Sequence, residues 1–257
     1  MKNRVSAIII CLFLSVASVC ATAQENYSDS IQISLLTCSP GPAIYELYGH
    51  TAIRVTNHTT GNDIVFNYGL FDFSSPNFIW RFTLGKTDYL LGAEYYKNFE
   101  RSYTRRGSEI YQQDLNISKA ESEKLFQLLS THAKPENRVY RYNFLDNNCA
   151  TMALDKIEEA VNGKIKYTQM DTTTTYRQLL HKYNMVSPWS SFGTDLVIGA
   201  DADTTIQNRQ FAFAPLELME LLAHATVTDS AGNVTPLVSE AYVVNNPQNE
   251  VVFGNYI

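Results

Sequence analysis

Cys149 and His50 are the two residues of this chain whose types and settings best suit nucleophilic chemistry. Cys149 follows the polar cluster Asp146–Asn148 and opens a stretch, Cys149 to Val161, whose apolar residues recur at nearly helical spacing. We expect Asn147 or Asn148 to cap this helix. A cysteine in a first helical turn meets unpaired backbone N–H groups and the positive end of the helix dipole, and both favour the thiolate. The sequence therefore indicates a cysteine enzyme.

A thiol nucleophile needs a base that also returns the proton, and a third group that fixes the tautomer of that base. His50 is the candidate base, because it follows Gly49 and opens a buried-looking β segment that would hold its ring on a rigid element. A packed, merely hydrogen-bonded histidine is the alternative interpretation. The other histidines lack such a setting and stand at positions 58, 132, 181 and 224.

Asn67 is the candidate third member of this set. Alternation along the segment Asp63 to Tyr68 places Asn67 where its side-chain oxygen can accept from an imidazole N–H. A strand-end asparagine without a catalytic part is the competing interpretation, and Asp72 is the reserve candidate. We expect the backbone N–H of Cys149 to face a developing oxyanion, with Tyr48 either adding a phenol donor or acting as a packed aromatic.

Composition narrows the function classes. The 257 residues are 45% hydrophobic and 18% charged, which is typical of a globular protein with a real core. The net charge is −6 and no basic run exceeds two residues, so a nucleic-acid partner is not expected. Scattered histidines, few cysteines and no glycine-rich phosphate loop predict neither a metal site nor a cofactor.

The N-terminal residues 1–23 have the pattern of a signal peptide. Lys2 and Arg4 precede an apolar run, and Ala21–Ala23 supplies the small residues of a cleavage site, which predicts export to the periplasm. The mature chain would keep only Cys38 and Cys149. In an oxidising compartment a disulfide between them is a competing possibility.

Hydrophobic patterns predict an α+β protein. A capping box at Ser118 and Glu121 predicts the start of one helix, and further helices are expected over Pro76–Leu84, Tyr176–Tyr183 and Pro215–His224. Expected strands cover Ile31–Thr37, Thr51–Thr56, Asp63–Tyr68, Glu109–Leu115, Arg138–Phe144 and Ala241–Val244. We predict a catalytic core over residues 27–165, with a helical extension and C-terminal tail, residues 166–257, packed on it.

Several spaced motifs resemble the Lnb N-terminal periplasmic domain family, over roughly residues 30 to 225. They are Leu35–Gly41, Tyr48–Val55, Phe66–Gly69, Asn137–Arg138 with Tyr140–Tyr142, and Asn148–Thr151. The family is similar to a circularly permuted papain-like fold of the NlpC type, with an antiparallel sheet and histidine before cysteine in the chain. The order of His50 and Cys149 agrees with that arrangement.

The resemblance implies acyl transfer at the membrane surface. Cys149 would take an acyl chain from a phospholipid or a diacylglyceryl lipoprotein as a thioester, and the N-terminal amine of a lipoprotein would accept it, with His50 moving the protons. A groove lined by Phe78, Ile79, Trp80 and Phe82 would hold the chain, although core packing is the alternative for these residues.

Two departures from the family leave the reaction open. Met152 stands where the family usually has arginine, and transmembrane helices follow this domain in the family, whereas this sequence ends at Ile257. Acyl transfer and hydrolysis therefore both remain as candidate reactions. The competing functions are a papain-like cell-wall peptidase or amidase, and a non-catalytic envelope domain in which Cys38 and Cys149 form a bridge.

Overall fold

The computed structural model describes residues 31–41, 46–71, 77, 80–81, 87–168, 173–184 and 188–245, without the side chains of residues 188, 190 and 197. The predicted signal peptide, residues 1–23, lies outside these ranges, as do most of the expected helix at 76–84 and the candidates Asp72, Phe78, Ile79 and Phe82. Among the described helices, none has the length and apolarity that crossing a membrane requires.

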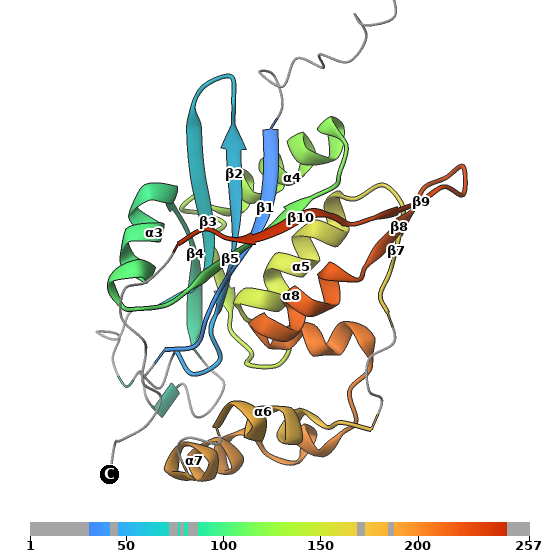
Figure 1. Cartoon of the computed structure of the whole chain (residues 1–257). Helices are drawn as coiled ribbons and strands as arrows, with labels where there is room; N and C mark the ends of the chain where they lie inside the picture. Colours follow the sequence, from blue (N-terminus) through green and yellow to red (C-terminus); the bar gives the residue numbers. More distant parts are fainter. Residues whose placement is uncertain are drawn as a thin grey trace, which may run out of the picture.

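A seven-stranded antiparallel sheet forms the centre of the molecule (Figure 1), in the order β10-β5-β1-β2-β3-β4-β6. Its strands are β1 (Ile31–Cys38), β2 (His50–Asn57), β3 (Asn62–Leu70), β4 (Asp88–Tyr95), β5 (Ile110–Leu115), β6 (Val139–Arg141) and β10 (Val238–Val243). A second, three-stranded sheet contains β7 (Lys164–Lys166), β8 (Thr226–Thr228) and β9 (Val234–Pro236).

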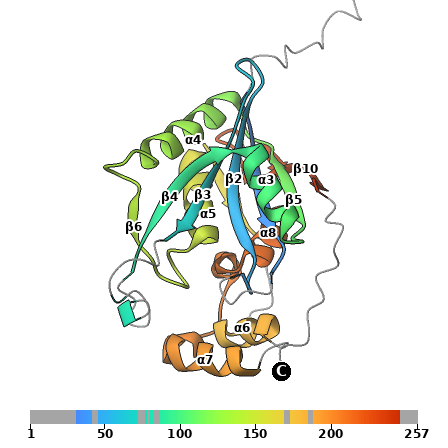
Figure 2. The same ribbon diagram turned by 90° about the vertical axis from the view of Figure 1, so that its left-hand side faces the viewer.

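Helices cover both faces of the large sheet. Helix α3 (Tyr96–Arg105) packs on one face, and α4 (Lys119–His132), α5 (Cys149–Ala160) and α8 (Pro215–Ala223) pack on the other (Figure 2). Helices α6 (Tyr176–Asn184) and α7 (Pro188–Ile198) lie together beyond one end of the sheet, with the 3₁₀ helices η2 (Ala200–Asp203) and η3 (Asn208–Phe213) following them in the chain.

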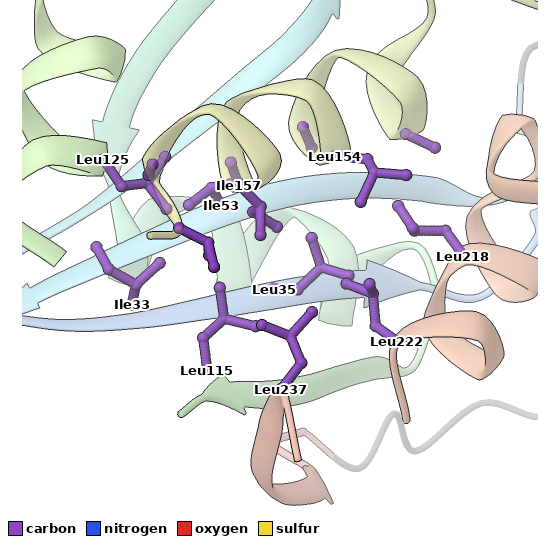
Figure 3. Packing of buried hydrophobic residues seen from close by; sticks show 14 of the residues in the cluster. Ile33, Leu35, Ile53, Leu115, Leu125, Leu154, Ile157, Leu218, Leu222 and Leu237 are labelled. Atoms are coloured by element: carbon purple, nitrogen blue, oxygen red, sulfur yellow. The ribbon is translucent and has the colours of Figure 1, made fainter. Parts of the chain in front are cut away.

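The two covered faces explain why β1 is buried along most of its length. Ile33 and Leu35 point into the core beneath α4, α5 and α8, whereas Leu36 and Cys38 join the cluster beneath α3. Figure 3 shows the first of these cores, where side chains from the sheet meet those of α4, α5 and α8. A strand buried on both faces needs apolar residues at successive positions, so strict alternation is absent.

The prediction of an α+β fold with a large antiparallel sheet is confirmed. The expected strand Arg138–Phe144 was wrong in length, because β6 ends at Arg141. Beyond it, the side chain of Asn143 accepts from the backbone of Leu145 and Asp146 and turns the chain toward α5. The division at residue 165 stays a prediction. From the second part, α8 shares the main core and β10 pairs with β5.

Candidate active site

Helix α5 begins at Cys149 because Asn148 caps it. The Asn148 side-chain oxygen accepts from the N–H groups of Ala150 and Thr151 at 2.8 and 3.0 Å, and the Thr151 hydroxyl accepts from the Asn148 N–H at 2.9 Å. Its amide nitrogen donates to the carbonyls of Phe144 and Phe213, which holds the cap in one rotamer. The cap leaves the N–H of Cys149 free to donate to the sulfur of the same residue.

His50 begins β2 at a point where the sheet opens. Strands β1 and β2 stay paired as far as Cys38 and His50, but the pairing of β2 with β3 ends at Ile53 and Phe66. Beyond that pair, the N–H of Thr51 donates to the Cys149 sulfur. The N-terminus of α5 therefore places its sulfur against the separated ends of two strands.

Gly69 keeps the space between the nucleophile and the base open. Its φ is 94°, and a Cβ built on it would lie 3.7 Å from Cys149 Cβ and 3.9 Å from His50 Cε1. The side chains of Cys149 and His50 thus flank one point beside β3. They are hydrogen-bonded to each other, although almost a hundred positions separate them in the chain.

Asn67 and Glu94 fix the tautomer of His50. The ring nitrogen Nε2 of His50 lies 2.5 Å from Asn67 Oδ1, and Asn67 Nδ2 donates to Glu94 Oε1 at 3.1 Å. A carboxylate can only accept, so the Asn67 amide must turn its nitrogen to Glu94 and its oxygen to His50. Nε2 therefore carries the proton, and Nδ1 is the nitrogen left to accept from the thiol of Cys149.

Electrostatics favour an ion pair between these two side chains. Burial raises the pKa of the Cys149 thiol, but the charge and hydrogen bond of His50 and the N–H of Thr51 oppose it, and the net pKa is lowered. Burial lowers the pKa of the His50 imidazole, but the charge and hydrogen bond of Cys149 and the bond to Asn67 make the net pKa higher than usual. Both directions favour thiolate and imidazolium.

Cys38 lies nearby without the same chemistry. It pairs with His50 across β1 and β2, it is completely buried, and burial raises the pKa of its thiol well above 9.0. Tyr103 of α3 donates to the Cys38 sulfur, and its ring stacks on His50 with centroids 6.1 Å apart. Both Cys38 and Cys149 are free thiols, so the bridge expected for a non-catalytic domain is not formed.

Two tyrosines near the site have different surroundings. The Tyr48 hydroxyl is hydrogen-bonded to Asn184 of α6 and Thr194 of α7, and its ring packs on Phe144. Tyr48 is thus engaged away from Cys149. The buried hydroxyl of Tyr140 accepts from the backbone N–H of Gly69 but has no acceptor for its own proton among the described residues, and Tyr140 lies close enough for the charge of Cys149 to raise its pKa.

The sequence analysis missed Glu94, Tyr140 and the N–H of Thr51 as parts of this site. Strand β4, which carries Glu94, was not predicted, because the run Tyr89–Leu91 does not alternate with polar residues in the sequence. The register of β4 against β3, which sets Glu94 beside Asn67, has no local sequence signal either. No histidine other than His50 is bonded to this site in the described residues, where His132, His181 and His224 bond to Tyr68, Asp195 and Glu220, respectively.

Comparison with known proteins gives one match. A family model described as the Lnb N-terminal periplasmic domain matches residues 20–182, a span that contains His50, Asn67 and Cys149. Searches of curated proteins and of solved structures gave no match.

Proposed function

The chain belongs to the Lnb N-terminal periplasmic domain family, and from this membership and the surroundings of Cys149 we propose that it is a thiol-dependent acyltransferase of the periplasm. The observation that carries the proposal is the chain of contacts from Cys149 through His50 and Asn67 to Glu94. A half-buried thiol with a lowered pKa, a base in one tautomer and a fixing amide are the parts that covalent acyl transfer needs.

The order of these residues supports a permuted papain-like core. Papain-like enzymes combine cysteine, histidine and asparagine, with the cysteine at a helix start. Here His50 and Asn67 come from neighbouring strands and Cys149 from the helix packed on them, with both strand residues earlier in the chain. Permutation changes which segment comes first and leaves the required contacts in place.

The proposed reaction has two half-reactions. In the first, the Cys149 thiolate attacks the carbonyl carbon of a glycerolipid ester, and a thioester forms as the ester C–O bond breaks. The leaving alkoxide takes the proton from His50 and departs as an alcohol. In the second, the N-terminal amine of a lipoprotein attacks the thioester, its proton passes to His50, and an amide forms as the C–S bond breaks. Cys149 and His50 return to their starting state.

Each half-reaction passes through an oxyanion that needs donors. The N–H groups of Cys149 and Thr51 lie at the sulfur and are the nearest backbone donors. We assign the third to Tyr140, whose buried hydroxyl has no acceptor among the described residues. A hydroxyl that gives up its hydrogen bonds on folding is costly, and a developing negative charge beside Cys149 would supply the missing acceptor.

The partners follow from the chemistry. The donor is an acylated glycerolipid, the acceptor is a lipoprotein N-terminus, and both are reached at a membrane surface. Trp80, one of the expected groove residues, has a 68% exposed side chain and is available for contact with an acyl chain. A cell-wall peptidase or amidase would use the same thiolate on an amide carbonyl, and the test must separate the two.

Mass spectrometry tests the proposal. The chain is incubated with phospholipid or with a diacylglyceryl lipopeptide, and the peptide containing Cys149 should gain the mass of one fatty acid minus water. The adduct should be absent from Cys149→Ala and retained in Cys38→Ala, which removes the other thiol. A lipopeptide with a free N-terminal amine should then discharge it and gain an N-acyl group.

Three outcomes would contradict this function. Unmodified Cys149 in a folded protein, checked by near-ultraviolet circular dichroism, would argue against a thioester. Fragments released from peptidoglycan without any lipid, and lost in Cys149→Ala, would assign the thiol to the peptidase alternative. Discharge of the thioester to water in the presence of the amine would make the chain a hydrolase.

A further inference from the structure

Helix α3 carries an open hollow of about 500 Å³ that is separate from the thiol and has no role in the mechanism above. Five side chains line it: Asn98, Arg101, Ser102, Arg105 and Arg106. All of them can donate hydrogen bonds, and none carries a negative charge. Figure 2 shows α3 in front of the sheet, on the face opposite α4 and α5.

The charges in this hollow are largely uncompensated. Six of the nine arginines in the described ranges form ion pairs, and the three without a partner there are Arg101, Arg105 and Arg138. Two of those three therefore line one hollow, in a chain whose net charge is −6. The Nε of Arg106 is buried and also lacks a hydrogen-bond partner among the described residues. Unpaired guanidinium groups that converge on one space suit an anion.

The hollow adjoins the candidate active site through its own wall. Arg106 lies 3.7 Å over the ring of Tyr103, and that ring stacks on His50 with centroids 6.1 Å apart. An ion pair with Glu46 holds Arg106 in this position. Arg106, which lines the hollow, and Tyr103 therefore connect the hollow to the base of the thiol by direct contacts.

We propose that this hollow binds the phosphate of a glycerophospholipid and so selects the acyl donor. The inference rests on the proposed function, and it chooses between its two donor classes, because a diacylglyceryl lipoprotein has no phosphate. Arginine forks match phosphate oxygens in pairs, and Ser102 and Asn98 add neutral donors. In a glycerophospholipid the phosphate and the acyl esters share one glycerol, so holding the phosphate on α3 brings an ester toward Cys149.

Binding is measured on the full chain carrying Cys149→Ala, so that no acyl chain is consumed. The probes are dihexanoyl phosphatidylglycerol as the phospholipid, dihexanoylglycerol as its phosphate-free analogue, and inorganic phosphate. The charge reversal Arg101→Glu with Arg105→Glu should weaken binding of the phospholipid about tenfold or more. The same change at Lys119 and Lys124, exposed on α4 across the sheet, is the matched control and should alter it less than about twofold.

The arms of this experiment separate the possible results. Three results together support the proposal. The affinity for the phospholipid should fall in the arginine variant, it should fall with added salt, and it should exceed the affinity for dihexanoylglycerol. Equal loss in both charge reversals, or equal binding of the phosphate-free analogue, overturns it. Tighter binding of inorganic phosphate than of phospholipid also overturns it, because the hollow would then hold a free ion.

Failure of this inference is distinguishable from failure of the acyltransferase function. Thioester formation on Cys149 from a diacylglyceryl lipopeptide does not need the hollow and should persist in the arginine variant. If neither donor ever acylates Cys149, the function fails, whereas the binding result stands by itself. If the charge-reversed protein does not fold, the salt dependence of phospholipid binding by the Cys149→Ala chain decides the question.

Discussion

Two sulfurs lie in adjoining parts of this molecule and differ in chemistry. Cys38, at the end of β1, faces the cluster beneath α3, and Cys149, at the start of α5, meets the separated ends of β2 and β3. Burial raises the pKa of both thiols. The pKa of Cys38 stays high, whereas His50 and the N–H of Thr51 reverse the shift at Cys149. At Cys38 the donor Tyr103 and the charge of Arg106 do not outweigh burial, whereas the charge and hydrogen bond of His50 and the backbone donors outweigh it at Cys149.

His50 also separates the two environments. It is the cross-strand partner of Cys38 and the hydrogen-bond partner of Cys149. The hydrogen bond between Nε2 of His50 and Asn67 orients the imidazole so that its other nitrogen meets Cys149. Among the described residues, no hydrogen bond to His50 turns a ring nitrogen toward Cys38. Orientation of the imidazole, more than its proximity, therefore decides which of the two thiols His50 can activate.

The largest expected effect is the difference in alkylation between the two cysteines. The pKa of Cys149 is lowered, so its thiolate persists below pH 9.0 and is lost only as the pH falls through the lowered value. The pKa of Cys38 is raised, so its thiolate forms only above pH 9.0. At neutral pH, iodoacetamide should modify Cys149 at least about 100-fold faster, because each pKa unit changes the thiolate fraction about tenfold. Peptide mass spectrometry over a pH series measures both rates.

Replacing His50 should remove this difference. In His50→Gln the charge and hydrogen bond of His50, the two largest effects that lower the pKa of Cys149, disappear while burial remains, so its alkylation at neutral pH should fall about tenfold or more. His132→Gln, which changes a histidine bonded to Tyr68, should leave the rate unchanged. Persistent alkylation of Cys149 in His50→Gln would mean that the backbone N–H groups of Thr51 and Cys149 activate the thiol without the imidazole.

A smaller effect is expected from Tyr140, the proposed oxyanion donor beside Cys149. Tyr140→Phe should lower kcat for thioester formation about 10- to 100-fold, because a donor is lost where negative charge develops. The free energy of unfolding should fall by no more than about 1–3 kcal/mol, because the N–H of Gly69 loses its acceptor while no bond donated by the hydroxyl is lost. Tyr68→Phe, which loses a hydroxyl bonded to His132, is the control and should keep its rate. A normal kcat in Tyr140→Phe would remove Tyr140 from the mechanism.

Local physics explains how much of this site could be predicted from the sequence. Asn148 before an apolar helical pattern fixes where α5 begins, so the sequence predicted that Cys149 stands in the first turn of a helix. Alternation in β3 placed Asn67 correctly, because a strand has a fixed two-residue period. The separation of β2 from β3, which lets Thr51 donate to the sulfur, comes from long-range pairing that no short pattern records. Glu94 was missed for the same reason, because its place beside Asn67 is set by the register of β4 against β3.

The smallest effect should come from Glu94, which acts on His50 only through Asn67. In Glu94→Gln the new amide can donate as well as accept, so Asn67 is free to turn its nitrogen toward His50 and favour the opposite tautomer. Because Glu94 is exposed, we expect kcat to fall about tenfold or less with KM unchanged. Nitrogen-15 NMR of the neutral His50 ring, recorded in a Cys149→Ala background where no thiolate holds a second proton on the ring, should show the proton shared between Nε2 and Nδ1, which a purely structural role would not produce. Glu123→Gln, an exposed change on α4, is the control. A single Nε2–H tautomer in Glu94→Gln would show that Asn67 orients the base without Glu94, and the activating contacts of Cys149 would end at Asn67.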